Sequence, residues 1–197
     1  MESRRYKANI TAGSLLVPES RKVAQLLLGG ITKADWKDAI ENQNILQRRS
    51  ISTAKRIAAL IKARLELMEP ALWNLVVDGD STVATHAVFA SAVKHCQLLG
   101  DYLDLVVREQ FNRFEDRLSG RIWDDYIAEC MQRDQLMEKF PDSTAIKIRS
   151  NVHKVLVEAG YLSDVRSKIL QRVEIAPEVV EYLEANNENY VLRCIQV

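Results

Sequence analysis

Apolar residues recur three and four positions apart along almost the whole of this 197-residue chain, and polar residues fill the positions between them. This spacing places the apolar side chains on one face of an α-helix, so the sequence predicts a mainly α protein. Pro at helix starts, Ser and Thr caps and Gly stops divide the pattern into segments. The helices expected from it cover residues 18–28, 33–42, 52–68, 70–77, 81–99, 102–114, 121–133, 143–159 and 177–185.

The pattern changes in the last third of the chain. Residues 169–175 and 190–196 are rich in β-prone side chains and predict two strands of a small C-terminal β-hairpin. With the helices over 121–133 and 143–159 and the stop at Gly160, they follow the order of a winged helix-turn-helix whose wing is the hairpin. The expected fold is therefore mainly α and multi-helical, with helix-turn-helix or winged-helix-like modules at both ends.

Charge is unevenly distributed, although 27 Lys plus Arg balance 27 Asp plus Glu. Residues 1–67 carry a net charge of +7, residues 68–142 carry −7, and residues 143–173 carry +4. Such blocks either attract an electrostatic partner such as nucleic acid or pair with one another inside the protein, and both alternatives remain open. The division predicts three domains, namely a basic N-terminal helical module over 1–68, an acidic central helical scaffold over 69–120 and a C-terminal winged-helix-like module over 121–197.

Motifs of the common enzyme and metal-binding classes are absent. No Walker loop, dinucleotide-binding glycine motif, zinc-protease motif or serine-hydrolase elbow occurs. The three cysteines are isolated, without the spacing of a disulfide framework or a zinc site, which suits a reducing compartment. The chain start lacks the apolar core of a secretory signal, and the most apolar stretch, residues 83–99, is too polar for a bilayer span. We expect a cytoplasmic protein that is not an enzyme, with no cofactor, metal or membrane contact.

The helix over residues 143–159 carries the candidate residues for reading DNA. On a helical wheel its apolar side chains fall within one arc, and the opposite side is polar. Lysines there supply cations for phosphate, and Ser and Asn supply short donors and acceptors for base edges. An ordinary solvated helix face is the alternative. The candidates on this side and its flank are Lys147, Arg149, Ser150, Asn151 and Lys154.

The N-terminal module offers a second set of cations. A basic arm that reaches along DNA is a known device, although a solvated chain end has the same composition. Arg64 falls on the apolar face of the third helix, where we expect it to pair with a carboxylate or else to contact a ligand. The candidates are Arg4, Arg5 and Lys7 on the arm, Arg48 and Arg49 in a turn, and Lys55, Arg56 and Lys62 on the third helix.

Several stretches resemble one family. Residues 6–14, which read Tyr-Lys-Ala-Asn-Ile-Thr-Ala-Gly-Ser, the helix over 19–28, the basic stretch over 49–56, Arg64-Leu65 and residues 158–162 are similar to BrxA, the A subunit of BREX bacteriophage-exclusion systems. The resemblance implies a mainly helical, non-catalytic cytoplasmic protein. It also implies DNA binding beside a DNA methyltransferase, an alkaline-phosphatase-like protein and an ATPase in phage defence. The family has been likened to a helical RNA-binding transcription antitermination factor, and it has no catalytic residue to transfer.

The pattern, the charge blocks and the resemblance together predict an accessory protein of a BREX system that binds double-stranded DNA. Because the candidate surface is rich in lysine and has few residues that read bases, we expect mainly phosphate contacts and weak sequence preference. One alternative is a protein-interaction adaptor that holds other BREX subunits and uses its basic ends for internal packing. Another is an RNA-binding factor, since lysines on a helix serve either phosphate backbone.

Overall fold

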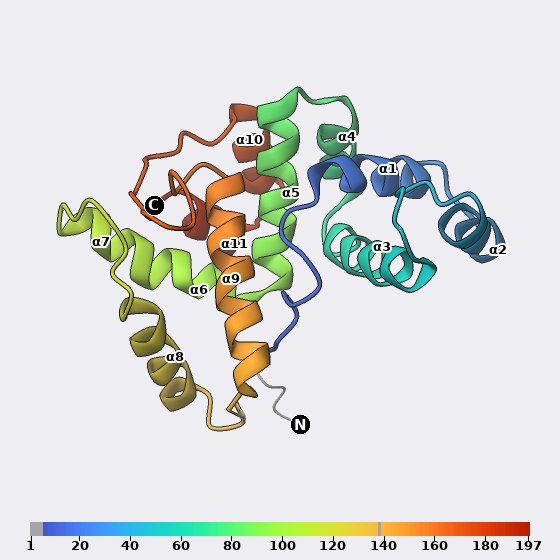
Figure 1. Ribbon diagram of the computed structural model, residues 1–197. Coiled ribbons are helices and arrows are strands. Elements are labelled where there is room, and N and C mark those ends of the chain that lie inside the picture. Colours follow the sequence, from blue (N-terminus) through green and yellow to red (C-terminus); the bar gives the residue numbers. More distant parts are fainter. Residues whose placement is uncertain (1–5, 138) are drawn as a thin grey trace.

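The computed structural model describes residues 6–137 and 139–197, and these residues form helices and connecting loops with no strand among them (Figure 1). The mainly α class expected from the sequence is confirmed. Two π-helical turns, η1 and η2, continue α2 and α6. The elements are α1 (Val17–Leu28), α2 (Lys33–Lys37), η1 (Asp38–Asn42), α3 (Ile51–Leu65), α4 (Pro70–Asp78), α5 (Ser81–His95), α6 (Gln97–Asp101), η2 (Tyr102–Val107), α7 (Arg108–Asn112), α8 (Ile122–Arg133), α9 (Asp142–Glu158), α10 (Pro177–Ala185) and α11 (Asn189–Ile195).

Short polar side chains begin three of these helices. Thr32 caps α2 and Asp80 caps α5, each through a side-chain oxygen that accepts a backbone N–H of the first turn. Ser50 caps α3 in the same way, two residues before Ser52, which the sequence had indicated as the cap of the helix expected over 52–68. The starts of these helices are therefore set by the local sequence.

Helix α5 forms the centre of the fold. From Val83 to Val93 its side chains are buried, except for the half-buried Thr85. Helices α1, α3, α4, α10 and α11 pack against it. A helix that is apolar nearly all round must be enclosed by other elements. The sequence predicted this enclosure correctly.

The N-terminal segment over residues 6–15 has no helix of its own and lies along α9 (Figure 1). Asn151 Nδ2 donates a hydrogen bond to the Ile10 carbonyl at 2.7 Å. The Glu158 carboxylate accepts one from the Leu15 backbone N–H at 2.8 Å. Two residues from the polar side of α9 therefore hold the segment in place.

Arg64 of α3 also contacts this segment. Its side chain is 2% exposed, and Nη1 donates to the Ser14 carbonyl at 2.7 Å. No ion pair joins Arg64 to a carboxylate of the described residues, so the expected pair is wrong. Burial lowers the pKa of the guanidinium to about 10. Because residues 6–15 contact both α3 and α9, contacts cross the expected boundaries, and the three-domain division stays a prediction.

The expected C-terminal hairpin between residues 169–175 and 190–196 is wrong. The second stretch forms α11, where Val191, Cys194 and Ile195 are buried at helical spacing and α11 packs on α5. Residues 169–175 form isolated β-bridges and no strand. The free energy gained by burying these side chains on one face of a helix outweighs their weak intrinsic preference for strands.

Three short segments, residues 116–118, 161–163 and 169–171, pair through their backbones instead. The pairing is antiparallel and includes the bridges Arg117↔Ile169 and Leu162↔Leu170. It brackets a turn over residues 164–168, in which Asp164 accepts backbone N–H groups. The hydrogen bonds run from Leu118 N to Lys168 O at 3.1 Å, Leu170 N to Asp116 O at 2.9 Å, Ser163 N to Ile169 O at 3.0 Å and Gln171 N to Tyr161 O at 2.9 Å.

Candidate nucleic-acid interface

Three of the expected α9 residues form one solvent-facing stripe. Lys147 and Lys154 are exposed, and Ser150 is half-exposed between them. Residues spaced three and four apart are neighbours on a helix surface, so the three side chains follow one line along α9. Neither lysine forms an ion pair with a carboxylate of the described residues. The stripe therefore presents two uncompensated cations.

The other two α9 candidates have partners within the protein. Asn151 donates to the Ile10 carbonyl and helps to hold the N-terminal segment. Arg149 Nη1 lies 3.8 Å from Asp124 Oδ1 of α8, and its side chain is 43% exposed. The contact surface on α9 is consequently narrower than the helical wheel indicated.

Most N-terminal candidates on α3 and in the preceding turn are paired. Arg48 bonds to Glu19 of α1. Lys55 lies 3.0 Å from Glu41, and Lys62 lies 3.6 Å from Glu66, with its ammonium 4.9 Å from the centre of the Trp36 ring. These three carboxylates belong to the same N-terminal block as the cations, so the pairs leave the net charge of +7 over residues 1–67 unchanged, and both alternatives for the charge blocks stay open.

The remaining N-terminal candidates are exposed or lie outside the described residues. Arg49 and Arg56 are exposed, and no ion pair involves them within the described chain. Lys7 is exposed and, with Thr144, lines a cavity at the first turn of α9. Arg4 and Arg5 fall outside the described residues. Lys7 therefore lies near the start of α9, whereas Arg49 lies just before α3 and Arg56 lies on α3.

Two further cations were missed at the sequence level. Arg166 is exposed and Lys168 half-exposed in the turn over residues 164–168, next to the end of α9. The signal was available, because Asp164 followed by Ser167 is typical of a turn in which a carboxylate accepts nearby backbone N–H groups. The hairpin was instead predicted between residues 169–175 and 190–196, because both stretches are rich in β-prone side chains.

His153 is a buried, titratable side chain on α9. It is 4% exposed, against the rings of Tyr102 and Trp123. Burial, and then the positive charges of Lys168 and Arg149, lower its pKa from 6.5 to about 4. The folded protein therefore holds this imidazole neutral at pH values where the unfolded chain protonates it.

The stability of the fold should consequently fall in mild acid. Because the unfolded state binds the extra proton, the contribution of His153 is full above pH 6.5 and is lost as the pH falls toward 4, by about 2–3 kcal/mol. Urea unfolding at pH 7.5 and pH 4.5 measures this loss. A His153→Leu variant should lose correspondingly less stability between these pH values, and an equal loss in both proteins would contradict the assignment.

Neither a membrane helix nor a cluster of metal ligands is found where the structure describes the chain. No described helix is both long and apolar enough to cross a membrane. Within the same ranges, His, Cys, Asp and Glu do not gather in groups of three or more that could hold a metal ion. Cys96, Cys130 and Cys194 are buried free thiols, and burial raises the pKa of Cys96 to about 11.

Comparison with known proteins identifies the family. A family model described as BrxA matches residues 4–187. The chain belongs to the BrxA family. It is 53% identical over 197 residues to the BREX protein BrxA of Paramagnetospirillum magneticum (strain ATCC 700264 / AMB-1), covering 100% of this chain and 99% of the relative. The BREX protein BrxA of Escherichia coli O9:H4 (strain HS) is 31% identical over 176 residues, 89% of this chain and 83% of the relative.

The fold also matches a crystal structure. That structure is of an uncharacterized protein from Magnetospirillum magneticum, with a TM-score of 0.92 and 52% sequence identity, and the match covers 98% of each chain. The arrangement of helices described above is therefore shared with this solved protein along nearly its whole length. The resemblance to the BrxA family that residues 6–14 and 158–162 carried is confirmed.

Proposed function

We propose that this member of the BrxA family is a non-catalytic accessory protein of a BREX phage-defence system that binds duplex DNA mainly through phosphate contacts. The observation that carries the proposal is the stripe of Lys147, Ser150 and Lys154 on α9, whose two ammonium groups pair with no carboxylate in the described part of the chain. Uncompensated lysines on an exposed helix face attract the phosphate backbone and release its counterions on binding.

The elements around α9 support a winged-helix-like arrangement. Helices α8 and α9 stand in the order of a helix-turn-helix, with α9 as the second helix. In the proposed arrangement the paired segments 116–118, 161–163 and 169–171 correspond to the short sheet of a winged helix, and the turn over 164–168 corresponds to its wing. In this arrangement Arg166 and Lys168 add cations near α9 and extend the phosphate contacts.

Sequence preference is expected to be weak. Asn151, which had the best chemistry for reading a base edge, donates its amide to the Ile10 carbonyl. Lysine is a point charge that suits phosphate better than the paired acceptors of guanine. The non-catalytic character rests on the family resemblance, and the other subunits of the system are the expected protein partners.

A protein-interaction adaptor is the second candidate, and two observations favour it. Arg48, Lys55 and Arg149 are each used within the protein, by Glu19, Glu41 and Asp124. Phe114 is 88% exposed in a left-handed backbone conformation, with φ of 57°. A bulky apolar side chain in that conformation costs folding free energy, which suits a contact with another protein. Capture of the methyltransferase, phosphatase-like or ATPase subunit after nuclease treatment would support this role.

Fluorescence anisotropy distinguishes these functions. Labelled duplex DNA, single-stranded DNA and duplex RNA are titrated with the protein at several salt concentrations. The DNA proposal expects duplex DNA to bind most tightly, with log affinity falling linearly against log salt by about 0.9 for each phosphate neutralised. Tighter binding to duplex RNA would favour the RNA alternative, and no binding to any of the three at low salt would favour the adaptor.

A further inference from the structure

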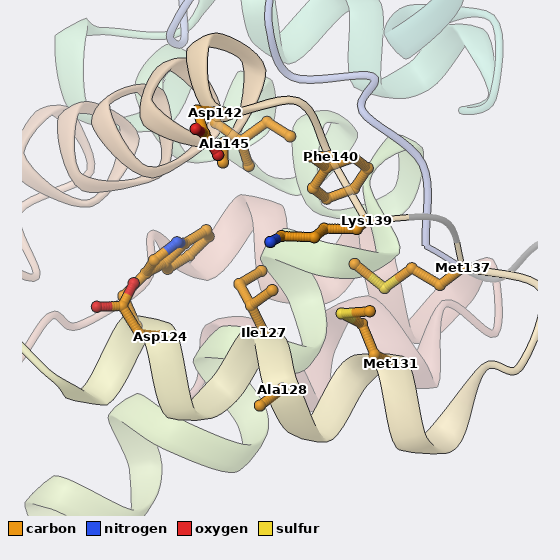
Figure 2. A pocket seen from close by; sticks show the side chains of 11 residues that line it. Asp124, Ile127, Ala128, Met131, Met137, Lys139, Phe140, Asp142 and Ala145 are labelled. Carbon is orange, nitrogen blue, oxygen red and sulfur yellow. The ribbon is translucent and has the colours of Figure 1, made fainter.

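An apolar cavity of about 260 Å³ lies between α8, the connection after it and the first half of α9 (Figure 2). Helix α8 contributes a stripe of side chains at every fourth position, and α9 contributes Ala145 and Ile148 from the facing side. Met137, Lys139 and Phe140, from the connection, line the third side. The main apolar side chains are Trp123, Ile127, Met131, Met137, Phe140 and Ile148.

The walls have the chemistry of a site for a flat ring. Two aromatic side chains, Trp123 and Phe140, offer ring faces and edges, which favour stacked or edge-on aromatic partners. Met131 and Met137 are unbranched and polarizable, so they adapt to the outline of a ring and make favourable contacts with it. Met131 is 38% exposed at the rim, and Ile148 is fully buried at the floor. The cavity is therefore apolar inside and open at one side.

One charge at this cavity is left without a partner. Figure 2 shows Lys139 reaching across the cavity above Ile127, and no carboxylate of the described residues lies within ion-pair distance of its ammonium. The two carboxylates of the lining are compensated. Asp124 faces Arg149 at 3.8 Å, and Asp142 lies in the first turn of α9, where the helix N-terminus stabilises negative charge. Of the three charged side chains that line the cavity, only the Lys139 ammonium has no compensating charge among the described residues.

We propose that this cavity binds a small aromatic anion, a carboxylate or sulfonate of one to three rings, with a ring between α8 and α9 and its anionic group at Lys139. The volume sets the size, because ligand sites usually measure roughly 300–1,000 Å³ and this one lies just below that range. The ligand needs neither DNA nor the exposed lysines of α9. This site is therefore independent of the proposed DNA-binding function.

A matched pair of fluorescent probes tests the site. Anilinonaphthalene sulfonate carries the aromatic body and the anion, and phenylnaphthylamine has the same rings without the charge. The wild-type protein should bind the sulfonate saturably and more tightly than the uncharged probe. Lys139→Gln should weaken the sulfonate about fivefold, the size of one partly exposed ion pair, and leave phenylnaphthylamine unchanged. Lys154→Gln, a lysine of α9 outside the cavity, should change neither affinity.

A cavity-filling variant locates the probes. Ala145→Phe places a ring inside the cavity and should abolish the fluorescence of both probes, with thermal unfolding used to confirm that the variant is folded. Should that variant not fold, Ala128→Phe fills the cavity from the exposed edge of α8 and should have the same effect. Unchanged probe binding in a folded filling variant, or an unchanged sulfonate affinity in Lys139→Gln, would overturn the proposal.

Discussion

Replacement of both stripe lysines, Lys147→Glu together with Lys154→Glu, is expected to weaken duplex DNA binding by roughly 10- to 100-fold at every sequence tested. The double variant should also reduce the slope of log affinity against log salt by about 2, because each lysine accounts for about one released counterion. The physical reason is that both lysines are exposed and that no carboxylate among residues 6–137 and 139–197 forms an ion pair with either of them. Anisotropy over a salt series measures both quantities on the same samples.

A control with the same change in net charge separates a local contact from a general charge effect. Lys33 and Lys37 are exposed on α2, which Figure 1 places at the opposite end of the molecule from α8. Lys33→Glu with Lys37→Glu should leave the salt slope nearly unchanged and lower the affinity only slightly. If the two double variants lose affinity equally, the contact surface on α9 is refuted.

The helical wheel of α9 shows how far local sequence can predict a site. Ile148, Val152 and Val155 are buried as the wheel indicated, and Lys147 and Lys154 are exposed on the other side. This works because a helix fixes the directions of its side chains through its own backbone. The exposed or buried state of a residue on a well-formed helix is therefore largely a local property.

Partners across the chain could not be predicted in the same way. Asn151 looked free to read a base, but its acceptor is the carbonyl of Ile10, 141 residues away in the sequence. Arg64 was expected to pair with a carboxylate, but its guanidinium donates a hydrogen bond to the backbone carbonyl of Ser14. Neither the charge distribution nor the helical periodicity of a sequence can indicate that a loop places a backbone carbonyl beside a helix. These two residues were misjudged because the position of residues 6–15 depends on the whole fold.

The prediction of a strand over residues 190–196 was wrong for a different reason. Tyr190, Val191 and Ile195 favour strands by type, yet the spacing of the buried residues in this stretch is that of a short helix. Short apolar runs are ambiguous between the two structures, and the neighbours decide. Here the neighbours are α5 and α10, both helices that offer a surface to a third helix.

The largest loss of stability is expected from Asp101→Ala. The Asp101 side chain is 2% exposed at the end of α6 and joins three parts of the chain. Tyr6 Oη donates to Oδ2 at 2.7 Å, and Tyr190 Oη and Gln97 Nε2 each donate to Oδ1 at 2.8 Å. Removal of the buried carboxylate takes this acceptor from the buried Tyr6 hydroxyl and from the half-buried Tyr190 and Gln97 side chains, and should cost about 3–5 kcal/mol. In thermal unfolding this corresponds to a fall in Tm of roughly 10 °C.

Two companion variants show whether the carboxylate itself is responsible. Asp78→Ala removes an exposed carboxylate at the end of α4 and should change the free energy of unfolding by less than about 0.5 kcal/mol. Gly100→Ala leaves Asp101 intact, but its new Cβ would overlap the Tyr190 hydroxyl and displace it from Asp101. It should reproduce part of the loss, about 1–3 kcal/mol. Full stability in Asp101→Ala would contradict this role, because it would show that the hydrogen bonds of the carboxylate to Tyr6, Tyr190 and Gln97 add nothing to the free energy of unfolding.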